Sequence, residues 1–301
     1  MEIKYFTNKE IDKKKWDNCI ANANNSLIYA YSFYLDNMAK NWDALVLNDY
    51  EAVMPLTWNK KYGIRYLYQP AFIQQLGIFS KESIAESTMR AFIDRIKIEF
   101  QFAEIFLNIA DPRSFTKPCA NFILPLNKAY KNIEANYKPS FIKSLKHAKK
   151  SMPLYLSPQN YMEAINTHIK EYGKRTTHVK DKDYKAFAAV CEFASAKNML
   201  VVRKAISPDN ELLAITLLLK DTNRLYNIMS VVPKQARSRE ANYFLYDEII
   251  KEFSQQVNAL DFEGSDISGI AEFYKKFGAI DQPYYFLRFN NLPWPLKYLK
   301  R

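Results

Sequence analysis

Apolar and polar residues follow two kinds of pattern in the first half of the chain. Short strand-like runs (IKYFT, WDALVLND, YEAVMPLTW and AEIFLNI) are separated by segments whose apolar residues recur every three or four positions. The segment 84–100 has apolar residues at positions 85, 89, 92, 93 and 96, which is the period of a helix. Asn48 and Asp49 join two of the strand-like runs and predict a hairpin.

The second half repeats this order of elements. PLYLSP is a strand-like run, two helical segments follow, and three apolar runs with polar turns at 207–210 and 221–223 predict an antiparallel meander. A helix, the strand NALDFEG, a further helix and the strand QPYYFLRF complete the unit. We therefore predict an α/β protein with mixed sheets in two similar domains, 1–130 and 131–301, with a basic helix over 140–150 at their junction.

Composition narrows the class of protein. The chain of 301 residues is 15% aromatic, so it can bury a sizeable core, and its 6 glycines argue against glycine-rich phosphate loops. No window approaches 18 consecutive apolar residues, which predicts no transmembrane segment, and the charged N-terminal sequence lacks the apolar region of a signal peptide. Cys19, Cys119 and Cys191 are far apart, which favours reduced thiols in a cytoplasmic protein.

Positive charge is concentrated in one part of the chain. The formal net charge is +11, and residues 131–185 contain twelve Lys or Arg against five Asp or Glu. This excess favours an anionic partner such as a phosphorylated cofactor, a nucleotide-linked substrate or RNA, although a solvated basic face has the same composition. The three histidines, His147, His168 and His178, have no ligand spacing, so we predict no metal site. Nothing in the pattern predicts an oligomeric state.

Three segments carry a resemblance to a known family. LYQPAFIQQLGIFS (67–80), PSFIKSLKHAKKS (139–151) and DFEGSDISGIAEFYKKFGA (261–279), together with the repeated order of elements, resemble the FemAB-like group. Its members are bacterial transferases, related to those that add amino acids to peptidoglycan precursors, with two tandem domains of the GCN5-related N-acetyltransferase (GNAT) fold. The resemblance implies transfer of an activated acyl or aminoacyl group to an amine, from acyl-CoA or aminoacyl-tRNA.

The tRNA-dependent members of this group have a long helical-hairpin arm. This chain has no heptad segment of that length, which weakens the case for an aminoacyl-tRNA donor. In GNAT enzymes the pyrophosphate of coenzyme A rests on a glycine-containing loop at a helix N-terminus. The matching place here, VVPKQARSREANYF, has Glu240 where a small residue is expected, and its candidate cofactor-binding residues are Lys234, Arg237, Arg239 and Asn242. Either these side chains replace the backbone loop, or this half does not bind coenzyme A.

Acidic residues stand where the strand NALDFEG ends. Asp261 and Glu263 share one face of this strand, near the edge at which open α/β sheets bind ligands. A carboxylate with a pKa raised by burial can take the proton of an attacking amine, so we predict Glu263 as the base and Asp261 as its partner. The alternative is structural: Asp261 pairs with a core Arg or Lys, and Glu263 caps backbone amides. Tyr226, on the meander, is a third catalytic candidate.

Candidate substrate-binding residues occur in both halves. On the helix FIKSLKHAKK, Lys143 and Lys146 share one side and can bind a phosphate, a carboxylate or tRNA, although a solvated helix has the same pattern. Phe141, Leu145 and Ala148 should face the core. In the first half, the amides near a proline and a strand exit can recognise a peptide or sugar or stabilise a turn, and an arginine can pair with a carboxylate. These first-half candidates are Arg65, Tyr68, Gln69 and Gln74.

Overall fold

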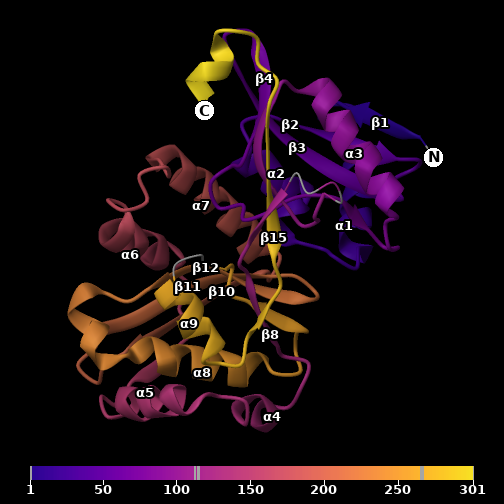
Figure 1. The fold of residues 1–301 in the computed structure, drawn as a ribbon. Coiled ribbons are helices and arrows are strands. Elements are labelled where there is room, and N and C mark those ends of the chain that lie inside the picture. The colour runs from indigo at the N-terminus through magenta and orange to yellow at the C-terminus, as the bar shows by residue number, and fades with distance from the viewer. Residues whose placement is uncertain (1, 112, 114–115, 265–267, 301) are drawn as a thin grey trace. The chain divides into compact units, whose positions relative to one another are not determined.

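The chain forms two compact units. Unit 1 comprises Met1–Cys119 and Pro283–Arg301, and unit 2 comprises Ala120–Gln282. Each unit contains one mixed β-sheet with helices packed on it, so the predicted α/β class is confirmed (Figure 1). The structure is a computed structural model, and it describes residues 2–111, 113, 116–264 and 268–300.

Unit 1 is built on an eight-stranded sheet. Its order is β1-β2-β3-β4-β6-β15-β7, and β5 pairs with β3. The predicted hairpin is formed by β2 and β3, and the predicted helix over 84–100 is α3. The elements are β1 (Ile3–Phe6), α1 (Lys13–Asn22), η1 (Ile28–Ala30), α2 (Ser32–Met38), β2 (Trp42–Leu47), β3 (Ala52–Lys61), β4 (Ile64–Tyr68), β5 (Phe79–Ser80), α3 (Glu86–Glu99), β6 (Phe102–Leu107), β7 (Thr116–Cys119), β15 (Tyr284–Asn290) and η3 (Leu296–Lys300).

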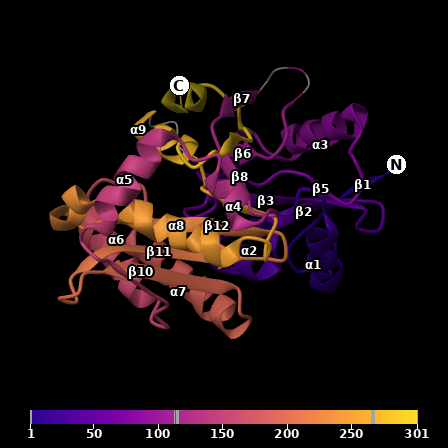
Figure 2. The same cartoon turned by 90° about the horizontal axis from the view of Figure 1, so that it is seen from below.

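Unit 2 is built on a seven-stranded sheet in the order β14-β8-β13-β12-β11-β10-β9. Helix α8 packs on one face with α5 outside it, and α6 and α7 pack on the other (Figures 1 and 2). The elements are β8 (Phe122–Pro125), α4 (Tyr130–Glu134), α5 (Pro139–Lys149), β9 (Leu154–Leu156), α6 (Met162–Tyr172), α7 (Asp181–Ala196), β10 (Leu200–Ile206), β11 (Leu212–Lys220), β12 (Arg224–Val231), η2 (Lys234–Arg239), α8 (Ala241–Phe253), β13 (Ala259–Asp261), α9 (Ser268–Lys275) and β14 (Ile280–Asp281).

The two sheets have the same topology. In unit 1, β4 is antiparallel to β3 and parallel to β6; in unit 2, β12 is antiparallel to β11 and parallel to β13. Strand for strand, β1-β2-β3-β4-β6 corresponds to β9-β10-β11-β12-β13. The predicted repetition of elements is therefore present in the strand order, as well as in the sequence of helices and strands.

Each sheet contains one strand from the segment that was predicted to belong to the other domain. β8 follows unit 1 in the chain and pairs with β13 and β14 of unit 2, whereas β15, from the end of the chain, pairs with β6 and β7 of unit 1. The observed units therefore differ from the predicted domains 1–130 and 131–301. The hydrogen-bonding partner of a strand is chosen by tertiary pairing, and neither strand's own sequence reveals which sheet it completes.

The core of unit 2 lies between its sheet and the layer of α4, α5, α8 and α9. The predicted inward face of α5 is confirmed, because Phe141, Leu145 and Ala148 are all buried. A separate core in unit 1 lies under α3. Among the described residues, no helix combines the length and the apolar character that crossing a membrane requires.

Candidate active site

In unit 2, β13 stops while its neighbour β12 continues. The two strands pair in parallel from Arg224 opposite Ala259 to Tyr226 opposite Asp261, where β13 ends. β12 runs on to Val231 and pairs over that stretch with β11. Beyond Tyr226, the other edge of β12 has no neighbouring strand in the described part of the chain. Carboxyl ends of parallel strands are where open α/β sheets bind ligands.

Asp261 is held in a buried ion pair at this end. Its carboxylate is 1% exposed, and Oδ2 accepts a hydrogen bond from Nη1 of Arg224 at 3.1 Å. Oδ1 accepts a hydrogen bond from the backbone N–H of Glu263 at 2.9 Å. Burial raises the pKa of Asp261, and the charge of Arg224 opposes that shift. These contacts match the structural alternative for Asp261, which orients the turn that follows β13.

The turn after β13 has a left-handed backbone. Glu263 has φ of 61° and Gly264 has φ of 57°. A Cβ atom on Gly264 would lie 2.1 Å from the carbonyl oxygen of Ala120 and 2.8 Å from Cα of Asn121, so this position excludes every other residue without a backbone shift. A glutamate in this region of φ/ψ space is uncommon, and the surrounding contacts hold it there.

The side chain of Glu263 differs from that of Asp261. Its Oε1 atom is buried and has no hydrogen-bond partner among the described residues. Burial raises the pKa of this carboxyl well above its usual range. A carboxyl group that is desolvated and unpaired binds a proton strongly, which is the property that a general base for an ammonium group needs. The predicted capping of backbone amides by Glu263 is not seen at Oε1.

Polar side chains gather on the sheet face near this turn. Oγ1 of Thr216 donates a hydrogen bond to Oδ1 of Asn227 at 2.9 Å. The hydroxyl of Tyr246 on α8 lies beside Ser230, Thr216 and Asn227; burial raises its pKa to about 12, and these three side chains moderate the shift. Tyr274 on α9 also has a pKa raised well above its usual range by burial, with a smaller contribution from the charge of Glu263.

Sequence reasoning did not select Thr216, Asn227, Tyr246 or Tyr274. The available signal was the presence of Thr216 and Asn227 inside otherwise apolar strands of the meander. Tyr226, which was selected, is fully buried, and its hydroxyl donates to Oδ2 of Asp221 at 2.8 Å. Burial raises the pKa of Tyr226 well above its usual range, and the structure places this side chain in the same cluster as Arg224 and Asp261.

The predicted cofactor-binding residues lie around the start of α8. Lys234 and Arg237 are exposed on η2, Asn242 is half-buried in the first turn, and Arg239 pairs with Glu211 at 2.9 Å. Glu240 is the N-terminal cap residue, with φ of 51°. Its carboxylate makes no capping hydrogen bond to α8, but a negative charge on the residue that begins the helix opposes a bound phosphate there.

Helix α5 packs beside this segment. Oγ of Ser144 donates to Oε1 of Glu240 at 3.3 Å, and Nε2 of His147 lies 3.1 Å from the carbonyl oxygen of Ser238. Lys143 and Lys146 of α5 are both exposed. The structure therefore brings the predicted basic helix and the predicted cofactor residues together on neighbouring elements of unit 2.

The first-half candidates lie in unit 1 and make structural contacts. Nη2 of Arg65 pairs with Oδ2 of Asp43 at 2.7 Å. Gln69 joins two segments: its Nε2 donates to the carbonyl of Ile73 at 2.9 Å, and its Oε1 accepts from the N–H of Phe106 at 3.0 Å. The hydroxyl of Tyr68 accepts from the N–H of Lys40, and Oε1 of Gln74 accepts from Gln75.

Arg65 also lines a cavity in unit 1 of about 540 Å³. Its guanidinium lies 4.3 Å from the ring centroid of Trp58, which lines the same cavity. Nε of Arg65 and Nε1 of Trp58 are buried donors without a partner among the described residues. Lys9 and Lys40 contribute positive charge to the lining, and Asp36 and Asp43 contribute paired carboxylates. The positively charged side chains in this lining suit a ligand with carboxylate, phosphate or carbonyl oxygens.

Comparisons with known proteins identify the fold. No protein-family model matches the sequence, and no curated protein matches it. Among solved structures, the chain is similar to FemX, with a TM-score of 0.69, 12% identity and 100% of both chains covered. It is also similar to the C-terminal domain of a putative lysylphosphatidylglycerol synthetase from Agrobacterium fabrum, with a TM-score of 0.56, 9% identity, and 96% of this chain and 94% of that chain covered.

A third similar structure is a tandem GNAT protein from the clavulanic acid biosynthesis pathway. Its TM-score is 0.52 at 11% identity, and 97% of this chain and 99% of that chain are covered. Together these similarities show that the chain has the tandem GNAT-like fold of FemX, which confirms the fold that the sequence predicted. In the described residues, no group of three or more His, Cys, Asp or Glu side chains is arranged to hold a metal ion.

Proposed function

We propose that this protein transfers an activated acyl or aminoacyl group to an amine. The observation that carries the proposal is the carboxyl of Glu263, which is desolvated, has no hydrogen-bond partner at Oε1 among the described residues, and is held in a left-handed turn where β13 ends beside β12. The tandem GNAT-like fold supports the same reaction class, because the similar structures include a tandem GNAT protein.

The proposed chemistry is a direct attack. The nitrogen lone pair of the acceptor forms a bond to the acyl carbon, and the bond from that carbon to the sulfur or oxygen of the donor breaks. Glu263 takes the proton that the amine must lose, and the leaving thiolate or alkoxide takes up a proton in turn. Asp261 acts as a positioning residue, since it accepts the backbone N–H of Glu263 and pairs with Arg224.

The donor is acyl-CoA or aminoacyl-tRNA, both of which carry phosphate. Lys234 and Arg237 at the start of α8, with Lys143 and Lys146 on the adjacent α5, supply exposed positive charge for it. Glu240 opposes an anion at the helix N-terminus itself. Side-chain cations rather than backbone amides therefore carry this contact in our proposal.

The acceptor is proposed to be an amine of a cell-envelope precursor. One of the similar structures is named as the C-terminal domain of a putative lysylphosphatidylglycerol synthetase, a name that joins an amino acid to a phospholipid, and this supports the envelope part of the proposal rather than the amine. The cavity in unit 1 fits an acceptor that carries acidic or carbonyl oxygens, since Lys9, Lys40 and Arg65 line it.

The first experiment is a calorimetric titration with acetyl-CoA at low and moderate salt. Binding would be followed by an assay of thiol release from acyl-CoA with a panel of primary amines. A parallel assay would follow a labelled amino acid from aminoacyl-tRNA to the same amines. Glu263→Gln is expected to lower turnover at least about tenfold. The matched control is Glu272→Gln, because Glu272 is exposed and pairs only with Lys275 in the described structure. Equal turnover of wild type and Glu263→Gln would remove Glu263 from the mechanism.

A second function is favoured by one specific observation, the glutamate at the α8 N-terminus. If Glu240 excludes the donor phosphates, the protein is a binding module that uses α5 for RNA or another anionic ligand. This function predicts binding of tRNA that weakens steeply with salt. It also predicts no turnover with either donor.

A further inference from the structure

One surface of unit 1 exposes large aromatic side chains beside lysines. Trp294 is 80% exposed, Tyr62 is 77% exposed and Tyr298 is 54% exposed. Tyr62 and Gly63 form the turn between β3 and β4, with φ of 51° and 80°, and this turn projects the tyrosine ring. The surface, called the aromatic–basic surface below, consists of the three aromatic residues with the exposed lysines Lys61 and Lys297.

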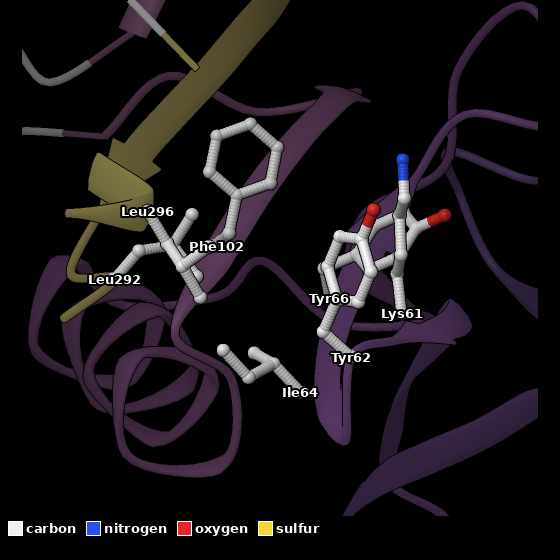
Figure 3. A pocket seen from close by; sticks show the side chains of 7 residues that line it. All are labelled: Lys61, Tyr62, Ile64, Tyr66, Phe102, Leu292 and Leu296. Atoms are coloured by element: carbon white, nitrogen blue, oxygen red, sulfur yellow. The ribbon is translucent and has the colours of Figure 1, made fainter. Parts of the chain in front are cut away.

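A pocket joins the two segments of this surface. It has a volume of about 230 Å³, and Figure 3 shows the side chains of the β3–β4 hairpin and of the C-terminal segment around it. The ammonium of Lys61 lies 5.2 Å from the ring centroid of Tyr62 at its rim. The lining is otherwise apolar or aromatic, and its residues are Ile64, Tyr66, Phe102, Leu292 and Leu296.

The charge of both segments has one sign. Residues 52–81 contain three Lys or Arg in addition to Arg65 and no Asp or Glu, and residues 282–301 contain four Lys or Arg and no Asp or Glu. Exposed Trp and Tyr with neighbouring Lys are typical of segments that lie at a membrane–water interface. Lysines near an anionic bilayer strengthen binding, and salt weakens it.

We propose that the aromatic–basic surface docks on an anionic lipid bilayer. Trp294 and Tyr62 enter the headgroup region, and Lys61 and Lys297 contact lipid phosphates. The pocket contributes aliphatic side chains that suit hydrocarbon. This lining favours lipid over nucleic acid. Nucleic acid is bound by aromatic stacking and by phosphate contacts, and leucine and isoleucine side chains provide neither. The inference concerns unit 1 and does not depend on the proposed transfer reaction.

The test uses the full chain and two kinds of vesicle. One contains phosphatidylcholine alone, and the other contains about 30% phosphatidylglycerol, which supplies the negative surface charge. Co-sedimentation is expected only with the anionic vesicles, and it should weaken as salt rises. Tryptophan emission should shift to shorter wavelength on binding. Trp16 and Trp42 are buried and Trp58 is half-buried, so the shift reports chiefly on Trp294.

Two double variants, each with a control variant, separate the proposal from nonspecific binding through exposed rings or positive charge. Trp294→Ser with Tyr62→Ser should lower vesicle partitioning at least about tenfold, and Lys61→Glu with Lys297→Glu should do the same. The controls are Phe193→Ser, which removes a 40% exposed ring in unit 2, and Lys182→Glu with Lys185→Glu on α7. Both controls should bind as the wild type does, and circular dichroism would check that each variant folds.

Three results would overturn the proposal. The first is equal partitioning of the wild type and the Trp294→Ser with Tyr62→Ser variant. The second is self-association in ultracentrifugation that this variant abolishes while vesicle binding is absent, because the surface then binds a second copy of the chain. The third is tRNA binding that this variant abolishes, again without vesicle binding.

Discussion

Gly264 offers a sharp test of the turn that holds Glu263. Replacing it with alanine puts a Cβ atom 2.1 Å from the carbonyl oxygen of Ala120 and 2.8 Å from Cα of Asn121. Both contacts are with backbone atoms, so no side-chain rotation relieves them. The alanine must also adopt φ near 57°, which costs about 1 kcal/mol relative to glycine.

The expected loss of stability combines these two effects. Overpacking of a fixed backbone costs about 1–3 kcal/mol, so the free energy of unfolding should fall by about 2–4 kcal/mol in total. This is a large part of the roughly 5–15 kcal/mol that stabilises an ordinary domain. If the turn moves to relieve the steric contacts of the new Cβ atom, the carboxyl of Glu263 is displaced. Turnover should therefore fall as well.

The assay is urea unfolding, followed by fluorescence and circular dichroism. Gly269→Ala is the matched control, because a Cβ there meets no atom within 4 Å and the residue lies in α9. That variant should be neutral or stabilised by up to about 1 kcal/mol. An equal urea midpoint for Gly264→Ala and the wild type would refute the argument that this turn requires glycine.

Three further predictions concern charge. Burial raises the pKa of Glu263, so the folded state binds the proton of this carboxyl more tightly than the unfolded state does. The free energy of unfolding therefore falls as pH rises from about 4.3, the unfolded pKa, through the folded pKa. Glu263→Gln should remove this loss, and its urea midpoint should exceed that of the wild type more at pH 8 than at pH 5. Arg65→Ala should lower the free energy of unfolding by about 2–3 kcal/mol, because it leaves the buried carboxylate of Asp43 without its cation. Arg90→Ala breaks an exposed ion pair and should lower it by under about 0.5 kcal/mol in the same unfolding assay. Lys143→Ala with Lys146→Ala should lower the salt dependence of tRNA or acyl-CoA binding in calorimetry, and an unchanged slope would exclude α5 from the donor site.

The repeated fold could be predicted because its evidence is local. The meander, the helix over 84–100 and the inward face of α5 each depend on residues within one turn of helix or one strand of each other. The unit boundaries could not be predicted in this way. β8 and β15 have ordinary strand sequences, and each completes a sheet formed mainly by a segment elsewhere in the chain.

The candidate site was predicted in part for the same reason. Two acids at the end of a strand are visible in the sequence, and so is the glycine that follows them. The sequence does not show how the environments of these two carboxyl groups differ. Asp261 has Arg224 as its partner because parallel pairing of β12 and β13 places them side by side, whereas Glu263 follows the end of β13 in a left-handed turn and has no partner at Oε1 among the described residues.

The sequence by itself determined the helices and strands, the repetition of their order, and the positions of the acidic and basic residues. Only the tertiary structure decided which strands complete each sheet, which carboxyl is paired, and which residues line the cavities described above in unit 1. The physical reason is that periodicity records which face of an element is buried, whereas hydrogen bonds, ion pairs and desolvation depend on residues far apart in the chain. Arg65 and Asp43, or Tyr62 and Leu292, meet only after the sheet of unit 1 has formed.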